Sequence, residues 1–338
     1  MILFKSHSKS KETIINDKIK KWSESLNKGS ILNVISAPYS DCDIFLSGVL
    51  DLLYKKKKVL YITNEDENNI AFLKNLKKKS NFRNYAYFRN KGHIDENTTL
   101  IFSNHINAYD ITDNFDLAIY DDVSCYNEFS KKEIEGLLLS RNSMKYICYS
   151  IEEVLKDGDV YEHSLLNTPF VEPRIINTRI DLNKDIPYMV YEYLNWFMES
   201  KRNVLIYVPG KDKVKIIEES IEKLNNNFKN LVLDLDNDYK RSLKLMKNKD
   251  VPTISIITSM YKIPKDVNNL DIIVYFADNV FFTYKKLIFI CGKAGLVSSP
   301  SLGEVIFLGN TTTEDMITAK DITRGFNKLA WESGLLRI

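Results

Sequence analysis

The amino-acid sequence predicts two consecutive α/β domains, each with a parallel β-sheet covered by helices on both faces. Short, continuously apolar runs alternate with longer amphipathic stretches, which is typical of buried parallel strands connected by helices. This alternation restarts after a polar segment near residue 180. The chain has 338 residues, a length that suits two domains of roughly 150 to 170 residues each.

The first domain is expected over residues 1–180. Its apolar runs predict strands over residues 31–36, 58–63, 98–103, 116–122 and 144–150. Amphipathic stretches between these runs predict helices over residues 43–56, 68–78 and 131–140. Because strands alternate with helices over most of this domain, the strands are expected to run parallel.

The second domain is expected over residues 181–338, after a charged, extended segment at 178–187. Strands are predicted over residues 203–208, 230–236, 253–258, 271–276 and 304–309. Helices are predicted over residues 188–200, 211–224 and 239–247, near 283–291, and after the capping threonines Thr311–Thr313. Two such domains joined by a short polar linker predict two lobes with a cleft between them.

Composition narrows the range of functions. The formal net charge is +2, so the chain as a whole attracts nucleic acid only weakly. No apolar stretch approaches the roughly 18 residues of a membrane span, and the N-terminal residues do not form a secretory signal. The four cysteines form no C-x-x-C pair and the four histidines show no ligand spacing. We therefore expect a reduced protein of the cytoplasm with no membrane span.

Two segments of the first domain occupy places where nucleotide chemistry is usual. The turn SAPYSDCDIF, residues 36–45, follows the first strand, where a phosphate-binding loop would lie, but it has no glycine and no lysine. The strand at 116–122 ends in Asp121 and Asp122. Such a pair is the pattern of a Walker B site, in which one carboxylate binds magnesium and the next activates water. An Asx turn or a helix cap is the alternative interpretation of the two acids.

A family resemblance is clearest over residues 271–309. There, Ala277-Asp278-Asn279 is followed by Val280-Phe281-Phe282-Thr283, a helix with Ile290, Gly292 and Gly295, and the strand start Gly303-Glu304-Val305. This arrangement resembles the end of superfamily 2 helicases, and specifically the ComFA family of competence DNA-uptake ATPases. The resemblance implies two tandem RecA-like domains of the P-loop NTPase type. It also implies ATP and magnesium as cofactors of an active member, and no counterpart of the family's cysteine-rich zinc module is expected here.

The departures from the family pattern lie at the residues that would perform the chemistry. In the Walker A place, where the resemblance sets the degenerate site at Ser40, Asp41, Cys42, Asp43 and Ile44, the lysine is replaced by Asp43, the following hydroxyl by Ile44 and the preceding glycine by Cys42. A carboxylate at this point repels phosphate by several kcal/mol at intermediate dielectric. Only Asp121 matches its metal-binding role, with Asp122 in place of the usual glutamate and Ser124 two positions further on.

The last helicase motif is eroded as well. Phe289 stands in the place of its glutamine, Lys293 in that of its first arginine and Leu296 in that of its second arginine. Leu296 cannot act as an arginine finger, and Lys293 keeps the charge without the bidentate fork. In motif V, Ile263-Pro264 replaces the Arg-Gly pair.

Three functions remain open from the sequence. The first is an ATPase-deficient helicase homologue that binds DNA or other DNA-uptake or DNA-processing proteins and has no cofactor. The second is a weakly active DNA translocase that uses ATP and magnesium through Asp121 and Asp122. The third is a non-enzymatic module that binds single-stranded DNA through lysines and stacked tyrosines, with Lys285 and Lys286 as candidate contacts beside Lys293. Ordinary core packing is the alternative explanation for the tyrosines, and solvation for the lysines.

Overall fold

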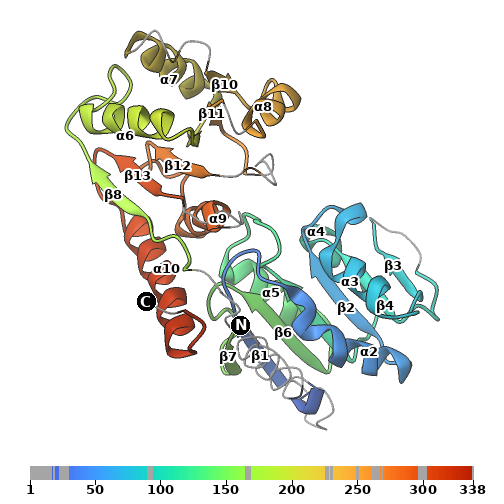
Figure 1. Cartoon of the computed structure of the whole chain (residues 1–338). Coiled ribbons are helices and arrows are strands. Elements are labelled where there is room, and N and C mark those ends of the chain that lie inside the picture. Colours follow the sequence, from blue (N-terminus) through green and yellow to red (C-terminus); the bar gives the residue numbers. More distant parts are fainter. Residues whose placement is uncertain are drawn as a thin grey trace. The chain divides into compact units, whose positions relative to one another are not determined.

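The protein is described by a computed structural model, which covers residues 17, 20–22, 30–89, 94–163, 169–224, 228, 231–248, 251–260, 267, 269–295 and 303–336. The chain divides into two compact units, Met1–Leu165 and Leu166–Ile338. Each unit is built on one parallel β-sheet, whose strands are drawn as arrows in Figure 1.

The sheet of the first unit has the strand order β3-β4-β2-β5-β6-β1-β7, and every neighbouring pair described is parallel. The strands are β1 (Ser30–Ile35), β2 (Val59–Thr63), β3 (Tyr85–Tyr87), β4 (Leu100–Ser103), β5 (Leu117–Asp121), β6 (Lys145–Ser150) and β7 (Asp159–Glu162). The helical elements are η1 (Cys42–Phe45), α2 (Leu46–Tyr54), η2 (Glu67–Asn69), α3 (Ala71–Lys79), α4 (His105–Ala108) and α5 (Lys131–Ser140).

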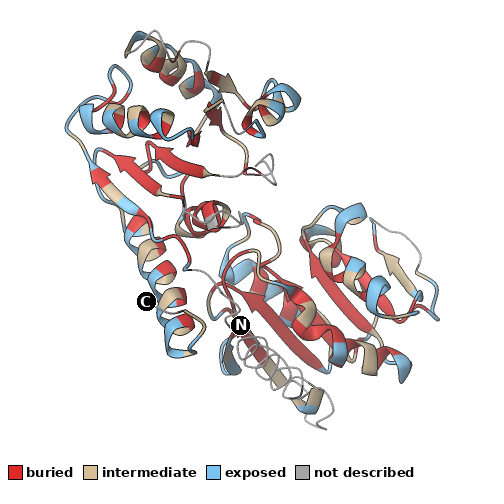
Figure 2. Cartoon of the chain, in the orientation of Figure 1, coloured by how far each residue is buried: buried red, intermediate tan, exposed pale blue. Residues whose placement is uncertain are grey.

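Helices cover both faces of this sheet, which explains why its central strands are apolar throughout. On β2, Tyr61 packs with α2 and α3 on one face and stacks on Phe72 at 4.6 Å between ring centroids. Leu60 and Ile62 lie on the other face, in the cluster that contains Leu137 of α5. All five residues of β2 are buried, as Figure 2 shows for the central strands.

The sheet of the second unit has the order β10-β11-β9-β12-β13-β8 and is also parallel over its described strands. The strands are β8 (Arg174–Asn177), β9 (Asn203–Tyr207), β10 (Val232–Asp234), β11 (Ile254–Ile257), β12 (Leu270–Tyr275) and β13 (Val305–Gly309). The helices are α6 (Tyr188–Glu199), α7 (Lys211–Leu224), α8 (Tyr239–Met246), α9 (Tyr284–Gly295) and α10 (Glu314–Glu332). The prediction of an α/β fold with two parallel sheets is therefore confirmed.

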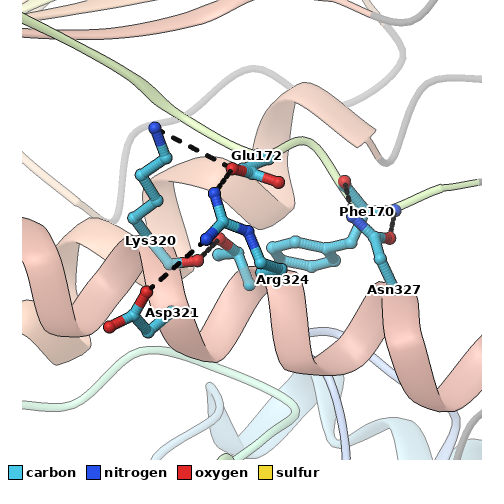
Figure 3. A network of polar contacts seen from close by, with 7 residues as sticks. Phe170, Glu172, Lys320, Asp321, Arg324 and Asn327 are labelled. Carbon is cyan, nitrogen blue, oxygen red and sulfur yellow. Dashed lines mark hydrogen bonds and ion pairs between the residues drawn. The ribbon is translucent and has the colours of Figure 1, made fainter.

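Along the chain, the boundary between the two units lies between residues 165 and 166. The sequence predicts this boundary at residue 180. The segment before β8 belongs to the second unit because it is fastened to α10, as Figure 3 shows. The backbone amide of Phe170 donates to the Asn327 side chain at 2.6 Å, and the Asn327 amide group donates back to the Phe170 carbonyl at 2.8 Å. Glu172 accepts from Arg324 at 2.6 Å and lies 3.9 Å from Lys320. β8 then adds to β13 as the edge of the second sheet.

Gly303 shows why a glycine stands just before β13. A Cβ built at this position would lie 2.0 Å from the Leu270 carbonyl oxygen, so only glycine allows the two backbones to approach this closely. Over the part of the chain that the structure describes, no helix has both the length and the apolarity needed to cross a lipid bilayer.

Candidate functional site

The structure brings together the two segments of the first unit that the sequence singles out. The 36–45 turn follows β1, Asp121 ends β5, and β6 lies between these two strands. The backbone amide of Tyr39 donates to the Val123 carbonyl at 2.9 Å, which joins the turn to the loop after β5. The carboxyl ends of β1 and β5 therefore form one site, as expected of a parallel α/β sheet.

Backbone amides in and beside the turn donate hydrogen bonds to other groups of the same chain. They donate as follows: Ser36 to the Ser150 carbonyl at 2.9 Å, Tyr39 to the Val123 carbonyl at 2.9 Å, Ser40 to the Ala37 carbonyl at 3.2 Å, and Asp43 to Asp41 Oδ1 at 3.0 Å. A phosphate-binding nest instead directs successive amides at the anion. The turn is thus closed on itself, and Tyr39 holds a left-handed conformation with φ of 63° in which glycine is the usual residue.

The negative charge of Asp43 is neutralised by side chains of helix α3. Asn75 Nδ2 donates to Asp43 Oδ1 at 2.6 Å, and Lys79 forms an ion pair with Oδ2. The Asp43 side chain is only 10% exposed, against 52% for Lys79. Lys79 is therefore a counterion to the Asp43 carboxylate within the chain itself.

The neighbours of Asp43 belong to the hydrophobic core. Cys42 is 1% exposed and Ile44 is 0% exposed, and both pack in the cluster beneath α2. Burial, followed by the charge of Asp121, raises the pKa of the Cys42 thiol far above its usual range. Neither side chain offers the hydroxyl oxygen that holds magnesium in a P-loop.

Asp121 is fully buried, and its carboxylate accepts four hydrogen bonds. Oδ1 accepts from the amides of Val123 at 3.0 Å and Ser124 at 2.9 Å. Oδ2 accepts from the hydroxyls of Tyr61 at 2.7 Å and Ser124 at 2.6 Å. A carboxylate has about four lone-pair positions, so this set leaves none directed at a metal ion. The geometry is that of an Asx turn closed by a strand-borne tyrosine.

Asp122 points to a different partner. It is 3% exposed, and its Oδ1 accepts from Asn127 Nδ2 at 2.5 Å. Its backbone amide donates to the Tyr149 carbonyl at 2.8 Å, which continues the pairing of β5 with β6. This carboxylate therefore fastens the loop 123–127 to the end of β5.

In the second unit, the Ala277-Asp278-Asn279 stretch holds the loop after β13. Asp278 Oδ2 accepts from the amides of Asn310 at 2.9 Å and Thr311 at 3.2 Å. A Cβ on Gly309 would lie 2.9 Å from the Asp278 carboxyl carbon, so this glycine makes room for the carboxylate. Asp278 therefore connects the loop after β12 to the loop after β13.

The candidate residues on α9 are largely enclosed. Phe289 is 0% exposed, Lys285 is 9% and Lys286 is 8% exposed. The Lys286 amine donates to the Phe281 carbonyl at 2.9 Å and lies 3.2 Å from the centre of that residue's ring. Lys293 is half-buried. This enclosure counts against the expectation that Lys285 and Lys286 contact DNA from an open surface.

Leu296, Ile263 and Pro264, which replace helicase residues in the sequence pattern, lie outside the described residues. Sequence reasoning missed the partners that close the first-unit site: Asn75, Lys79 and Tyr61. Lys79 ends a run of three lysines in the sequence. Its pairing with Asp43 depends on the approach of α3 to η1, which no local pattern reveals.

The fold of the chain, with two tandem parallel-sheet α/β domains of RecA-like type, is similar to that of two solved structures. Among solved structures, it is similar to RecG bound to a three-way DNA junction, with a TM-score of 0.53 and 12% identity over 95% of this chain and 46% of that one. It is also similar to the E. coli DExH-box NTPase HrpB, with a TM-score of 0.52 and 12% identity over 86% of this chain and 40% of that one. The chain thus spans less than half the length of either protein. No protein-family model and no curated protein matches the sequence.

Proposed function

We propose that this chain is a catalytically inactive superfamily 2 helicase homologue of ComFA type, which keeps the RecA-like scaffold for binding DNA or a DNA-processing partner. The observation that carries the proposal is the pairing of the Asp43 carboxylate with Asn75 and Lys79. The sequence resemblance aligns Asp43 with the Walker lysine of the family. An ATP phosphate entering this turn would meet a carboxylate in place of an amine.

The environment of Asp121 supports the same proposal. Magnesium takes oxygen ligands in a nearly ideal octahedron, usually through one or two carboxylates. To serve as such a ligand, Asp121 would have to release donors among Tyr61, Val123 and Ser124. Each hydrogen bond to a charged group contributes about 1.5–3 kcal/mol, so the release opposes metal binding. The residues present do not fit the ATP–magnesium group, and we derive no hydrolytic step through it.

The fold supports the part of the proposal that concerns binding to DNA or to a DNA-processing partner. RecG, to which the chain is structurally similar, was solved bound to a three-way DNA junction. The ComFA resemblance over residues 271–309 adds DNA uptake as the process in which such a scaffold would act.

The experiment is a calorimetric titration of the whole chain with ATP and magnesium, followed by a hydrolysis assay with and without single-stranded DNA. We expect no ATP binding up to millimolar concentration and no hydrolysis. Asp43→Asn is the matched variant, because it removes the repelling charge without adding a lysine, and any residual nucleotide affinity should rise in it. Micromolar ATP binding by the unmodified chain would overturn the proposal and favour a weakly active translocase.

A further inference from the structure

A groove lies in the first unit between helix α3 and the edge strand β3, with a volume of about 380 Å³. Its apolar base is formed by Ile70, Leu73 and Phe102. Tyr85 and Tyr87 of β3 line one side. This volume lies within the range of roughly 300–1,000 Å³ that is usual for small-molecule sites, and it is large enough for a nucleotide.

The two tyrosines present their rings along the groove. They are two residues apart on one strand, so they lie on the same face of the sheet, separated by roughly 6.6 Å along the strand. Both are half-buried, and the Tyr85 ring meets Phe102 edge-on at 6.4 Å. Within residues 30–89 and 94–163, neither phenol hydroxyl has a hydrogen-bond partner. One part of each ring therefore packs against the core, and the other part faces the groove.

The groove has a positive rim. Lys74 and Lys77, one turn apart on α3, are both exposed, and Lys77 Nζ lies 4.6 Å from the centre of the Tyr85 ring. The lining contains one carboxylate, Glu67, and it is neutralised by the bidentate contact of Arg89, with Nε to Oε2 at 2.8 Å and Nη2 to Oε1 at 2.5 Å. The charge of Asp66 also reaches Tyr87. Lys74, Lys77 and Arg89 together still outweigh Glu67 and Asp66, so the surroundings of the two rings keep a net positive charge.

Helix α3 separates this groove from the degenerate nucleotide site. Lys74 and Lys77 face the groove, whereas Asn75 and Lys79 hold Asp43. Binding in the groove therefore does not require any residue of the 36–45 turn.

We propose that this groove binds single-stranded nucleic acid, with bases stacked on Tyr85 and Tyr87 and the phosphodiester backbone beside Lys74 and Lys77. The inference rests on the nucleic-acid-binding half of the proposed function and not on the loss of ATPase activity. Aromatic rings set along a positive groove bind single strands with little sequence preference, because every base has a face that can stack. The rim charge complements phosphates, whereas a peptide strand added to β3 would make no use of it.

The test is fluorescence anisotropy of a labelled oligothymidine with the whole chain, without nucleotide, at two salt concentrations. We expect Tyr85→Leu/Tyr87→Leu to weaken binding by about 5- to 150-fold for each base that stacks, while Tyr85→Phe/Tyr87→Phe stays near the unmodified chain. Lys77→Gln should lower the slope of log affinity against log salt by about 0.7. Lys78→Gln is the matched control, since Lys78 is exposed on the same helix but does not line the groove.

Circular dichroism and the melting temperature show whether each variant is folded, and leucine keeps the apolar cover over Phe102. The proposal is overturned if the oligonucleotide does not bind, if the leucine pair binds as well as the phenylalanine pair, or if Lys77→Gln and Lys78→Gln behave alike. ATP binding in the separate titration would overturn the inactive-helicase proposal and leave the groove result standing.

Discussion

The buried carboxylate of Asp121 provides the most decisive test of the site, through the substitution Asp121→Ala. In an active helicase, this change would remove a metal ligand and leave the fold nearly intact. In this chain the carboxylate joins β2, β5 and the following loop by four hydrogen bonds. The expected primary effect is therefore a loss of stability of the first unit.

The size of the effect follows from the groups left behind. Tyr61 is 0% exposed, so its hydroxyl would lose its acceptor inside the core. An unsatisfied buried donor costs about 1–3 kcal/mol. The Val123 amide, also buried, would add a similar amount. Because such contributions are not additive, we expect a total of about 3–5 kcal/mol. Ser124→Ala removes one hydroxyl donor to the charged carboxylate and should cost about 1.5–3 kcal/mol.

Hydrogen exchange measured by mass spectrometry suits a chain of two units, since it reports the opening free energy of each segment separately. Peptides covering β2 and β5 should lose protection in Asp121→Ala, while peptides covering β9 and β12 in the second unit serve as the internal reference. A decrease below about 1 kcal/mol in the first unit, together with lost magnesium or ATP binding, would refute the reasoning and restore Asp121 to a metal-binding role.

Two further predictions concern the buried side chain of His163 and the close approach of Gly303 to the backbone of Leu270. Burial lowers the pKa of His163 from 6.5 to about 4, so the folded state favours the neutral imidazole. The free energy of unfolding is therefore highest above pH 6.5 and decreases as the pH falls toward 4. The loss should approach about 3 kcal/mol, and His163→Leu should flatten the dependence of the urea midpoint on pH over this range; an unchanged profile would contradict it. Gly303→Ala should destabilise the second unit by more than about 2 kcal/mol, because its Cβ would lie 2.0 Å from the Leu270 carbonyl oxygen. In the matched variant Gly325→Ala, whose Cβ meets nothing within 4 Å in the middle of α10, stability should rise by about 0.5–1 kcal/mol; thermal melts of both variants decide the comparison.

Much of the fold was predictable, because the central strands are buried on both faces and so carry long apolar runs. The sequence predicts helices at 131–140 and 211–224, and the structure has α5 and α7 over the same residues. The edge strands β3, β7 and β8 were missed, since they are short and partly exposed and have no such run. The expected helix at 43–56 begins as the 3-10 turn η1 and continues as α2, because Asp41 caps the tighter turn.

The site was less accessible to sequence reasoning. The carboxylate at position 43 and the pair at 121–122 were visible as residue types. Their partners come from elements distant in sequence: Lys79 follows Asp43 by 36 positions, and Tyr61 precedes Asp121 by 60. The groove between α3 and β3 depends on an edge strand that the pattern did not reveal.

The clasp between the 170–172 segment and α10 bears on how the protein is divided for study. A fragment that begins at residue 181 would lack β8 and leave β13 with an unpaired edge. It would also remove the partners of Asn327 and Arg324 on α10. Unpaired strand edges promote association between copies, so such a fragment should aggregate. A fragment that begins at Leu166 would keep the strand and the clasp together, and would be the better choice for expressing the second unit alone.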